Sequence, residues 1–139
     1  MVKIELAQIN ADYDFEATGP NGHKVQMQNG KHAFGTSPMQ LLLMGLGGCS
    51  AIDMISILKK QRQDLHDIKI TITGDKDPDA EPSLWQTASL EFHVFGPVDK
   101  NKALRAAELS MEKYCSVAMT LKNSGTKIDW TVVMHPESN

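Results

Sequence analysis

Hydrophobic and polar residues alternate along the first part of the chain. Apolar side chains occupy every second position at 2–6 and again at 13–17, and a shorter stretch at 25–27 has the same period. This period is typical of a strand that buries one face. The turn-forming sequence Gly19-Pro20-Asn21-Gly22 separates the second stretch from the third, and Asn29-Gly30 follows the third. These positions predict an N-terminal meander of about three strands.

The most apolar part of the chain, residues 38–61, predicts one long helix. Ser37 is a good N-cap, Pro38 fits the first helical position, and Gln40 completes a Ser-x-x-Gln capping box. Basic side chains lie near the far end, where they complement the helix dipole: Lys59, Lys60 and Arg62. A helix of this extent would be roughly 36 Å long at about 1.5 Å per residue.

Two further alternating stretches, around 68–72 and 90–94, predict a second group of strands. A polar, proline-bearing loop at 75–82 separates them. A second helix then follows through 104–111, and Asp99 stands where its N-cap would be. The chain therefore returns from strands to a helix after the long apolar segment.

The C-terminal part predicts a short helical turn after Cys115 that ends near Gly125, and then a last strand over 128–134. The strands do not alternate regularly with helices along the chain. This order favours an α+β fold with largely antiparallel pairing. The length is close to the commonest domain size, and no repeat or long linker interrupts the chain, so we expect a single domain over 1–139.

The long helix is apolar on every side, and such a helix must be covered on every side. Its large apolar residues are Leu41, Leu42, Leu43, Met44, Leu46, Ile52, Met54, Ile55, Ile57 and Leu58. Four such side chains left in water would lose on the order of 10 kcal/mol, comparable with the stability of a whole domain. We therefore expect a homodimer, and the alternative is a compact monomer with this helix as its core.

Composition and charge exclude several classes of partner. The net charge is -3, the lysines are scattered, and aromatic residues make up only 6% of the chain, so we expect no nucleic-acid surface. The segment 41–58 is about as long as a membrane span. Asp53 in its middle would cost roughly 2.5–3.5 kcal/mol there, so we expect a buried helix and no membrane partner. The first residues carry no export signal, which predicts a cytoplasmic protein with reduced thiols.

Cys49 lies midway along the apolar helix, directly after Gly47 and Gly48. Two glycines inside a helix cost about 1 kcal/mol each relative to alanine. Close approach of another backbone, or room for a ligand beside the next side chain, would offset that cost. Cys49 is therefore either a small buried apolar residue or a thiol that faces a pocket.

Cys115 lies where the second helix ends and the short helical turn begins. A helix N-terminus lowers the pKa of a thiol, because the free N–H groups favour the thiolate. Asp53 stands one turn beyond Cys49, and its negative charge opposes thiolate formation. The alternative for Cys115 is a core residue at a helix–helix corner. Two cysteines at special backbone positions are consistent with an attacking and a resolving thiol.

Histidine spacing gives no support for a metal centre. The histidines show neither His-x-His nor His-x-x-x-His spacing. They are His23, His32, His66, His93 and His135. We therefore expect no metal site and no cofactor.

Two sequence motifs resemble the OsmC/Ohr superfamily of osmotically inducible and organic-hydroperoxide-resistance proteins. They are Thr36-Ser37-Pro38-Met39-Gln40-Leu41-Leu42, with its spacing to Cys49, and Tyr114-Cys115-Ser116-Val117-Ala118. The resemblance implies an intertwined homodimer with the central helices packed together. It also implies thiol-dependent reduction of organic hydroperoxides, with Cys49 as the attacking residue, Cys115 as the resolving residue and a dithiol donor as the reductant.

The chain departs from the peroxidases of that superfamily at two positions. Met39 occupies the position of their Glu, and the only arginines, Arg62 and Arg105, lie outside the N-terminal strands that supply their Arg. The chain is more similar to a branch that keeps both cysteines and lacks the Arg–Glu pair. Lys31 and His32 are the nearest cations in sequence that could activate the first thiol instead.

A non-catalytic binding module is the alternative function. In that case an apolar or thiol-bearing small molecule would occupy a pocket at the dimer interface without being turned over. The separation of the two sulfurs distinguishes the hypotheses, since redox chemistry requires that they approach disulfide distance.

Overall fold

The computed structural model describes residues 1–10, 12–31 and 35–137. The chain divides into two compact units, Met1–Leu42 and Leu43–Asn139, and each is described by itself. The single domain expected from the sequence stays a prediction.

Three short strands form the sheet of the N-terminal unit. They are β1 (Glu5–Gln8), β2 (Phe15–Thr18) and β3 (Lys24–Met27), in the order β1-β2-β3 with both pairs antiparallel. The predicted meander is confirmed, although β1 begins later than the alternation at 2–6 suggested. Gly22 in the β2–β3 turn has a φ of 79°, a conformation that glycine adopts without strain.

Helix α1 (Pro38–Lys60) begins with the predicted capping box. The Gln40 N–H donates to Ser37 Oγ at 3.3 Å, and the Ser37 N–H donates back to Gln40 Oε1 at 3.1 Å. Each side chain therefore satisfies a backbone donor at the start of the helix. The helix ends one residue before the predicted boundary, and Arg62 just beyond it has a left-handed φ of 58°.

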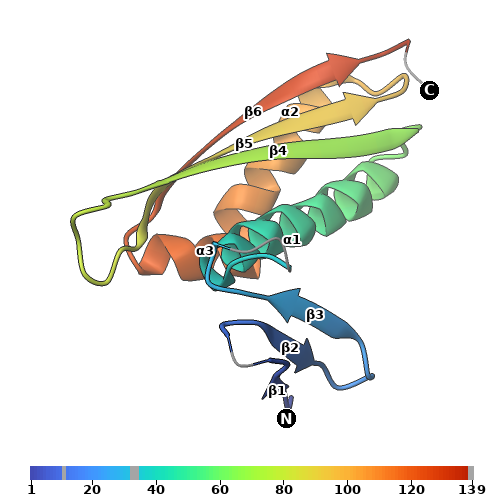
Figure 1. Cartoon of the computed structure of the whole chain (residues 1–139). Helices are drawn as coiled ribbons and strands as arrows, with labels where there is room; N and C mark the ends of the chain where they lie inside the picture. Colours follow the sequence, from blue (N-terminus) through green and yellow to red (C-terminus); the bar gives the residue numbers. More distant parts are fainter. Residues whose placement is uncertain (11, 32–34, 138–139) are drawn as a thin grey trace. The chain divides into compact units, whose positions relative to one another are not determined.

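The C-terminal unit places a three-stranded sheet against helices (Figure 1). After α1 its elements are β4 (Asp67–Lys76), β5 (Trp85–Phe95), α2 (Lys100–Leu109), a π-helical turn η1 (Ser110–Tyr114), α3 (Ser116–Asn123) and β6 (Lys127–His135). The Asp99 side chain caps α2 as predicted, accepting from the Lys102 N–H at 3.0 Å. The α+β class and the OsmC-like arrangement of elements are confirmed.

Strand β5 lies at the centre of this sheet, in the order β4-β5-β6. It pairs antiparallel with β4 and parallel with β6. Three of the four described strand pairs are antiparallel and β5–β6 is parallel. The prediction of largely antiparallel pairing is therefore correct, but it did not identify the parallel pair. The helices α2 and α3 carry the chain back along the sheet, so that β6 runs in the direction of β5.

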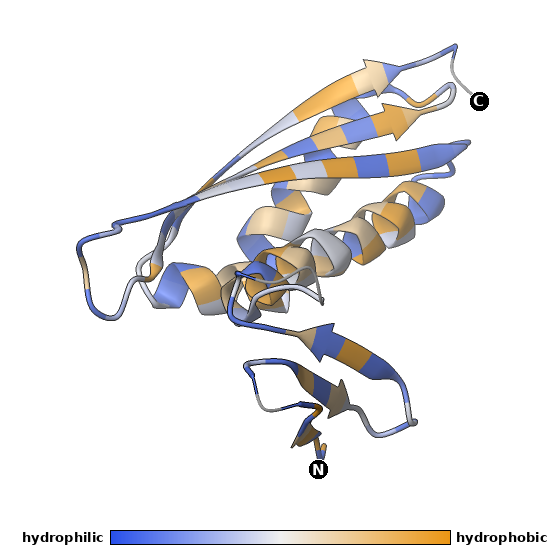
Figure 2. Cartoon of the chain, in the orientation of Figure 1, coloured by the Kyte–Doolittle hydropathy of each residue, from blue (hydrophilic) through white to orange (hydrophobic). Residues whose placement is uncertain are grey.

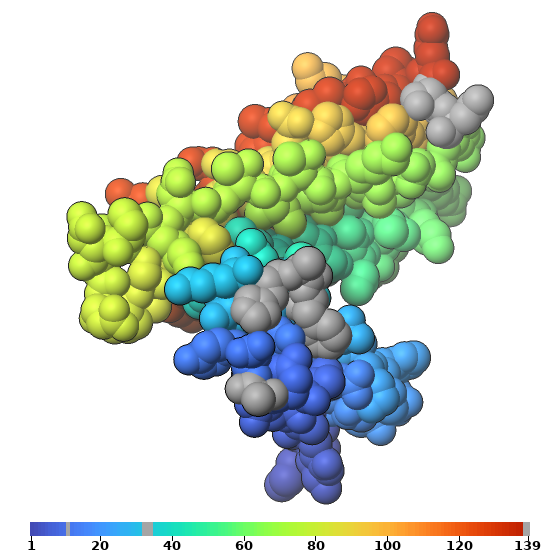
Figure 3. All heavy atoms as spheres, viewed as in Figure 1, coloured from blue at the N-terminus to red at the C-terminus, as the bar shows by residue number. Residues whose placement is uncertain are grey.

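The core of the C-terminal unit lies between the sheet and the helices. The strands alternate apolar and polar residues (Figure 2), and every second residue of β5 from Ala88 to Val94 is buried. Side chains of α1 and α2 pack against them, among them Leu46, Met54 and Ala107. In the space-filling view, atoms of β4 lie along one side of α1 (Figure 3). One face of the sheet and the helices packed on it therefore form the core together.

Two opposite sides of α1 differ in what covers them. The inner stripe is fully buried in the core and consists of Leu46, Ser50, Met54 and Leu58. The outer stripe is exposed and consists of Met44, Gly48, Ile52 and Ser56. Met44 and Ile52 expose 56% and 67% of their surface. Within the described residues, this side of the helix keeps two large apolar side chains exposed.

By length and composition alone, α1 is also apolar enough to cross a membrane. However, its inner stripe belongs to the core of the C-terminal unit. It also carries a half-buried carboxylate, Asp53, whose partner is a hydroxyl on η1. Both features are typical of the core helix of a globular protein.

Candidate functional site

The two cysteines lie together with Asp53. Cys49 and Asp53 are one turn apart on α1, at the border between its inner and outer stripes, and both are half-buried. Cys115 is fully buried at the N-cap of α3. The two sulfurs and a carboxylate oxygen of Asp53 all lie within 4.8 Å of one another. Both thiols are free.

The π-helical turn η1 brings two residues to this cluster. The Cys115 N–H donates to the Ser110 carbonyl at 2.8 Å, which closes the wide turn. At its start, Ser110 Oγ donates to Asp53 Oδ2 at 2.9 Å. Single π-turns of this kind are frequent at functional sites. Sequence reasoning missed Ser110, because no local sequence signal marks a π-turn.

Burial and negative charge decide the protonation of Cys115. Burial is the main cause that raises the pKa of this thiol from 9.0 to about 11. The hydrogen bond to Cys49 and the charges of Cys49 and Asp53 raise the pKa further. The Ala118 N–H at the start of α3 lies 3.4 Å from the sulfur and lowers it, as the sequence suggested. The expectation of a depressed pKa is nevertheless wrong, because burial outweighs the helix terminus.

The two glycines before Cys49 have different roles. A Cβ at Gly47 would collide with the side chain of Ile72 on β4. This glycine therefore allows a side chain of the sheet to pack closely on the helix, whereas the sequence had suggested the close approach of another backbone. A Cβ at Gly48 would meet no described atom within 4 Å outside its own stretch of helix. Open space therefore lies over Gly48, on a different side of the helix from the contact of Gly47 with Ile72.

In the described structure, neither arginine of the C-terminal unit forms an ion pair with the cluster. Arg105 pairs with Glu108 at 3.0 Å, and Arg62 is exposed beyond the end of α1. Lys31 is exposed in the N-terminal unit, and His32 lies outside the described residues. Among the residues with described positions, Asp53 forms no ion pair.

Two histidines that are distant in sequence do meet on the sheet. His93 Nδ1 and His135 Nε2 are 2.9 Å apart, and His93 Nε2 lies 2.6 Å from Glu91 Oε1. The two histidines lie near each other because their strands, β5 and β6, pair in parallel. Local histidine spacing could not have revealed this contact.

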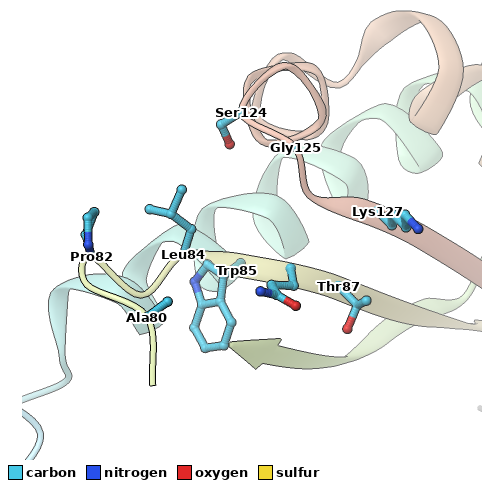
Figure 4. A pocket seen from close by; sticks show the side chains of 9 residues that line it. Ala80, Pro82, Leu84, Trp85, Thr87, Ser124, Gly125 and Lys127 are labelled. Atoms are coloured by element: carbon cyan, nitrogen blue, oxygen red, sulfur yellow. The ribbon is translucent and has the colours of Figure 1, made fainter. Parts of the chain in front are cut away.

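A separate hollow of about 450 Å³ lies beside the start of β5 (Figure 4). Neither cysteine lines it. Its lining residues are Ala80, Pro82, Leu84, Trp85, Gln86, Thr87, Ser124, Gly125 and Lys127. The hollow is thus distinct from the thiol cluster.

A family model described as OsmC-like protein matches residues 28–131, which include both cysteines and the whole of α1. The chain belongs to the OsmC-like family. The resemblance found in the sequence motifs is therefore confirmed. The matched region includes residues of both compact units.

Two similar proteins have names that state no activity. Protein YhfA of Escherichia coli K12 is 41% identical over 111 residues, 79% of this chain and 82% of that protein. A hypothetical protein from Aquifex aeolicus has 32% identity and a TM-score of 0.82, with 97% of this chain and 98% of that chain covered.

A solved structure with a named activity shares the fold at lower identity. It is an organic hydroperoxide resistance protein OsmC, also named a predicted redox protein, from Legionella pneumophila. It has 16% identity and a TM-score of 0.72 over 95% of this chain and 96% of its own. At this identity the likeness shows the fold alone.

Proposed function

We propose that this OsmC-like protein reduces organic hydroperoxides through Cys49 and Cys115. The supporting observation is the separation of the two sulfurs, at most 4.8 Å, in a chain whose thiols are otherwise far apart in sequence. Disulfide bonds need a sulfur separation of about 2 Å. A side-chain rotation with a modest backbone shift can close that gap. The name of the Legionella pneumophila protein is consistent with this chemistry.

The difference in solvent exposure between the two thiols indicates which of them attacks the peroxide and which resolves the intermediate. Cys49 is half-buried and Cys115 fully buried, so Cys49 is the thiol that a small molecule can approach. Cys115 is fully buried and remains protonated at neutral pH, because its pKa is raised to about 11. Attack requires an accessible thiolate. Cys49 is therefore the attacking residue and Cys115 the resolving one.

The cycle has three balanced steps. The Cys49 thiolate attacks one peroxide oxygen, the O–O bond breaks, and the alcohol leaves after taking up a proton, which gives a sulfenic acid on Cys49. The Cys115 thiol then attacks that sulfur, and a disulfide and water form. An external dithiol reduces the disulfide to two thiols and becomes a disulfide itself.

The same proposal includes the assembly and location. Two copies would pack through the outer stripe of α1, which covers Met44 and Ile52 and encloses an apolar pocket beside Cys49. Removing these side chains from water would contribute about 1.5–3 kcal/mol each. A cytoplasmic location would keep both thiols reduced between turnovers.

A binding module without turnover is the second candidate. It is favoured by the charges at the site: Asp53 lies beside both sulfurs, and within the described residues no cation pairs with it. Negative charge opposes formation of a thiolate. Met39 also stands where the peroxidases of the superfamily carry Glu.

Mass spectrometry of the reduced protein after one equivalent of cumene hydroperoxide tests the proposal. We expect a Cys49–Cys115 disulfide in the wild type, a sulfenic acid on Cys49 in Cys115→Ser, and no peroxide consumption by Cys49→Ser. Asp129→Asn, at an exposed position of β6, is a matched control that should behave as wild type. Unmodified wild-type protein with all peroxide remaining would favour the binding module.

A further inference from the structure

We propose that Cys49, Asp53 and Cys115 form a binding site for zinc or another thiophilic divalent cation. The three side chains offer two sulfurs and one carboxylate oxygen, and all three atoms lie within 4.8 Å of one another. Thiolates with one carboxylate form a donor set suited to zinc. The inference goes beyond peroxide reduction and does not depend on it.

The separations fit a tetrahedral cation after small side-chain rotations. Zinc binds sulfur at about 2.3 Å and carboxylate oxygen at about 2.0–2.2 Å, so neighbouring ligand atoms lie roughly 3.5–3.8 Å apart. The observed upper limit of 4.8 Å exceeds this range by about 1 Å. Cys49 and Asp53 are also four residues apart on α1, the spacing at which a helix presents two ligands to one metal.

Neighbouring donors hold two of the ligands in place. Ser110 Oγ donates to Asp53 Oδ2 at 2.9 Å, which leaves the other carboxylate oxygen available for a cation. The Ala118 N–H lies 3.4 Å from Cys115 Sγ and orients that sulfur. Hydrogen bonds of this kind commonly fix metal ligands and are nearly as important as the ligands themselves.

The charge of the cluster also favours a cation. Two thiolates beside a carboxylate repel one another, and within the described residues no ion pair compensates Asp53. Binding of a divalent cation would displace one proton from each thiol and cancel two of the three negative charges. Three protein ligands would leave the fourth position of a tetrahedral cation for water or the thiol of a small molecule.

Histidine spacing in the sequence argued against a metal, but this cluster contains no histidine. Its members come from α1 and from the N-cap of α3, and only the fold brings them together. A set of side chains with nitrogen and oxygen donors, His93, His135 and Glu91, lies on β5 and β6. It provides an internal competitor for the test.

Zinc titration of the reduced, metal-free protein by calorimetry tests the site. We expect one ion per protomer, micromolar affinity or tighter, and release of about two protons per ion. Cys49→Ser, Cys115→Ser and Asp53→Asn should each weaken binding by at least about 10-fold, and Ser110→Ala by about 10-fold. Asp129→Asn and His135→Gln should bind zinc as wild type does.

Cobalt provides a second readout that needs no variant. Cobalt bound by thiolates gives a sulfur-to-metal charge-transfer band, which should appear in the wild type and disappear on addition of zinc. Absence of this band, zinc binding that survives both cysteine substitutions, or loss of binding in His135→Gln would each overturn the site. Peroxide consumption is measured separately with a chelator present, so failure of one proposal leaves the other intact.

Discussion

The inner and outer stripes of α1 both carry large apolar side chains but have opposite surroundings. Leu46, Met54 and Leu58 are fully buried against the sheet, whereas Met44 and Ile52 expose more than half of their surface. The inner stripe is explained by the chain's own packing. The outer stripe is not explained in this way, since Met44 and Ile52 keep most of their surface exposed. The comparison separates residues that stabilise the protomer from residues that a second copy would cover.

The thiol cluster occupies the border between the two stripes. Cys49 and Asp53 are half-buried there, while Cys115 approaches from the core side. A group in this position is held by packing on one side and can be reached on the other. Substitutions on the two stripes should therefore affect stability and assembly separately, and substitutions at the border should affect protonation.

The largest effect is expected on the inner stripe. Met54→Ala removes a fully buried side chain from the core and leaves a cavity, so the free energy of unfolding should fall by about 2–5 kcal/mol. Denaturant unfolding followed by circular dichroism measures the change. Met44→Ala on the outer stripe is the matched control. An equal loss in both variants at low protein concentration would contradict the distinction between the stripes.

On the outer stripe, a charge should change assembly more than folding. Ile52→Glu places a carboxylate on the surface that two copies would share, so association should weaken at least 10-fold, about 1.4 kcal/mol. Sedimentation over a range of concentrations measures this change. The free energy of unfolding of the dilute protomer should stay within about 0.5 kcal/mol. A monomeric wild-type protein would refute the proposed homodimer.

The neighbouring glycines of α1 should respond oppositely to alanine. The new methyl group of Gly48→Ala meets no described atom, so the higher helix propensity of alanine should raise the free energy of unfolding by about 1 kcal/mol. The change is measured in the Ile52→Glu background, so that a partner helix does not contact the new methyl group. The new methyl group of Gly47→Ala would collide with the Ile72 side chain, and overpacking typically costs about 1–3 kcal/mol. The gain from helix propensity should therefore be cancelled, or the free energy of unfolding should fall. Adding Ile72→Val should relieve the conflict. Equal effects of the two single alanines would mean that Ile72 does not constrain Gly47.

Local signals in the sequence predicted most of the elements. The capping box of Ser37 and Gln40 and the cap at Asp99 are contacts between residues three apart, so their chemistry is visible in the sequence. Alternation predicted the strands because one face of each is buried. The apolar circumference of α1 likewise predicted that the core would not take up all of its apolar side chains, and Met44 and Ile52 are exposed among the described residues.

Non-local features could not be predicted in the same way. The parallel β5–β6 pair depends on the path of the chain through α2 and α3, which no short pattern encodes. The π-turn places Ser110 on Asp53 through a backbone irregularity without a sequence signature. The proximity of the two cysteines was implied by the family resemblance, whereas the raised pKa of Cys115 follows from burial that only the fold reveals.

The smallest expected effect is that of a substitution at the border of the stripes, Asp53→Asn, on the pH at which Cys115 loses its proton. Because the pKa of Cys115 is raised from 9.0 to about 11, the unfolded chain releases this proton at lower pH than the folded protein does. The contribution to stability is therefore complete below pH 9.0 and is lost as the pH rises towards about 11. Asp53→Asn removes one negative charge near the sulfur and should lower the pKa of Cys115. The thiolate absorbance of this thiol should then rise at lower pH.

Cys115→Ser is the control for this titration, since it should remove both the absorbance step and the associated loss of stability above pH 9.0. Asp129→Asn should leave the curve unchanged, because its carboxylate is exposed on β6. Since burial is the main cause of the raised pKa and the charge of Asp53 the smallest of the named causes, most of the shift should persist in Asp53→Asn. A return of the pKa to 9.0 in that variant would show that charge, not burial, governs Cys115.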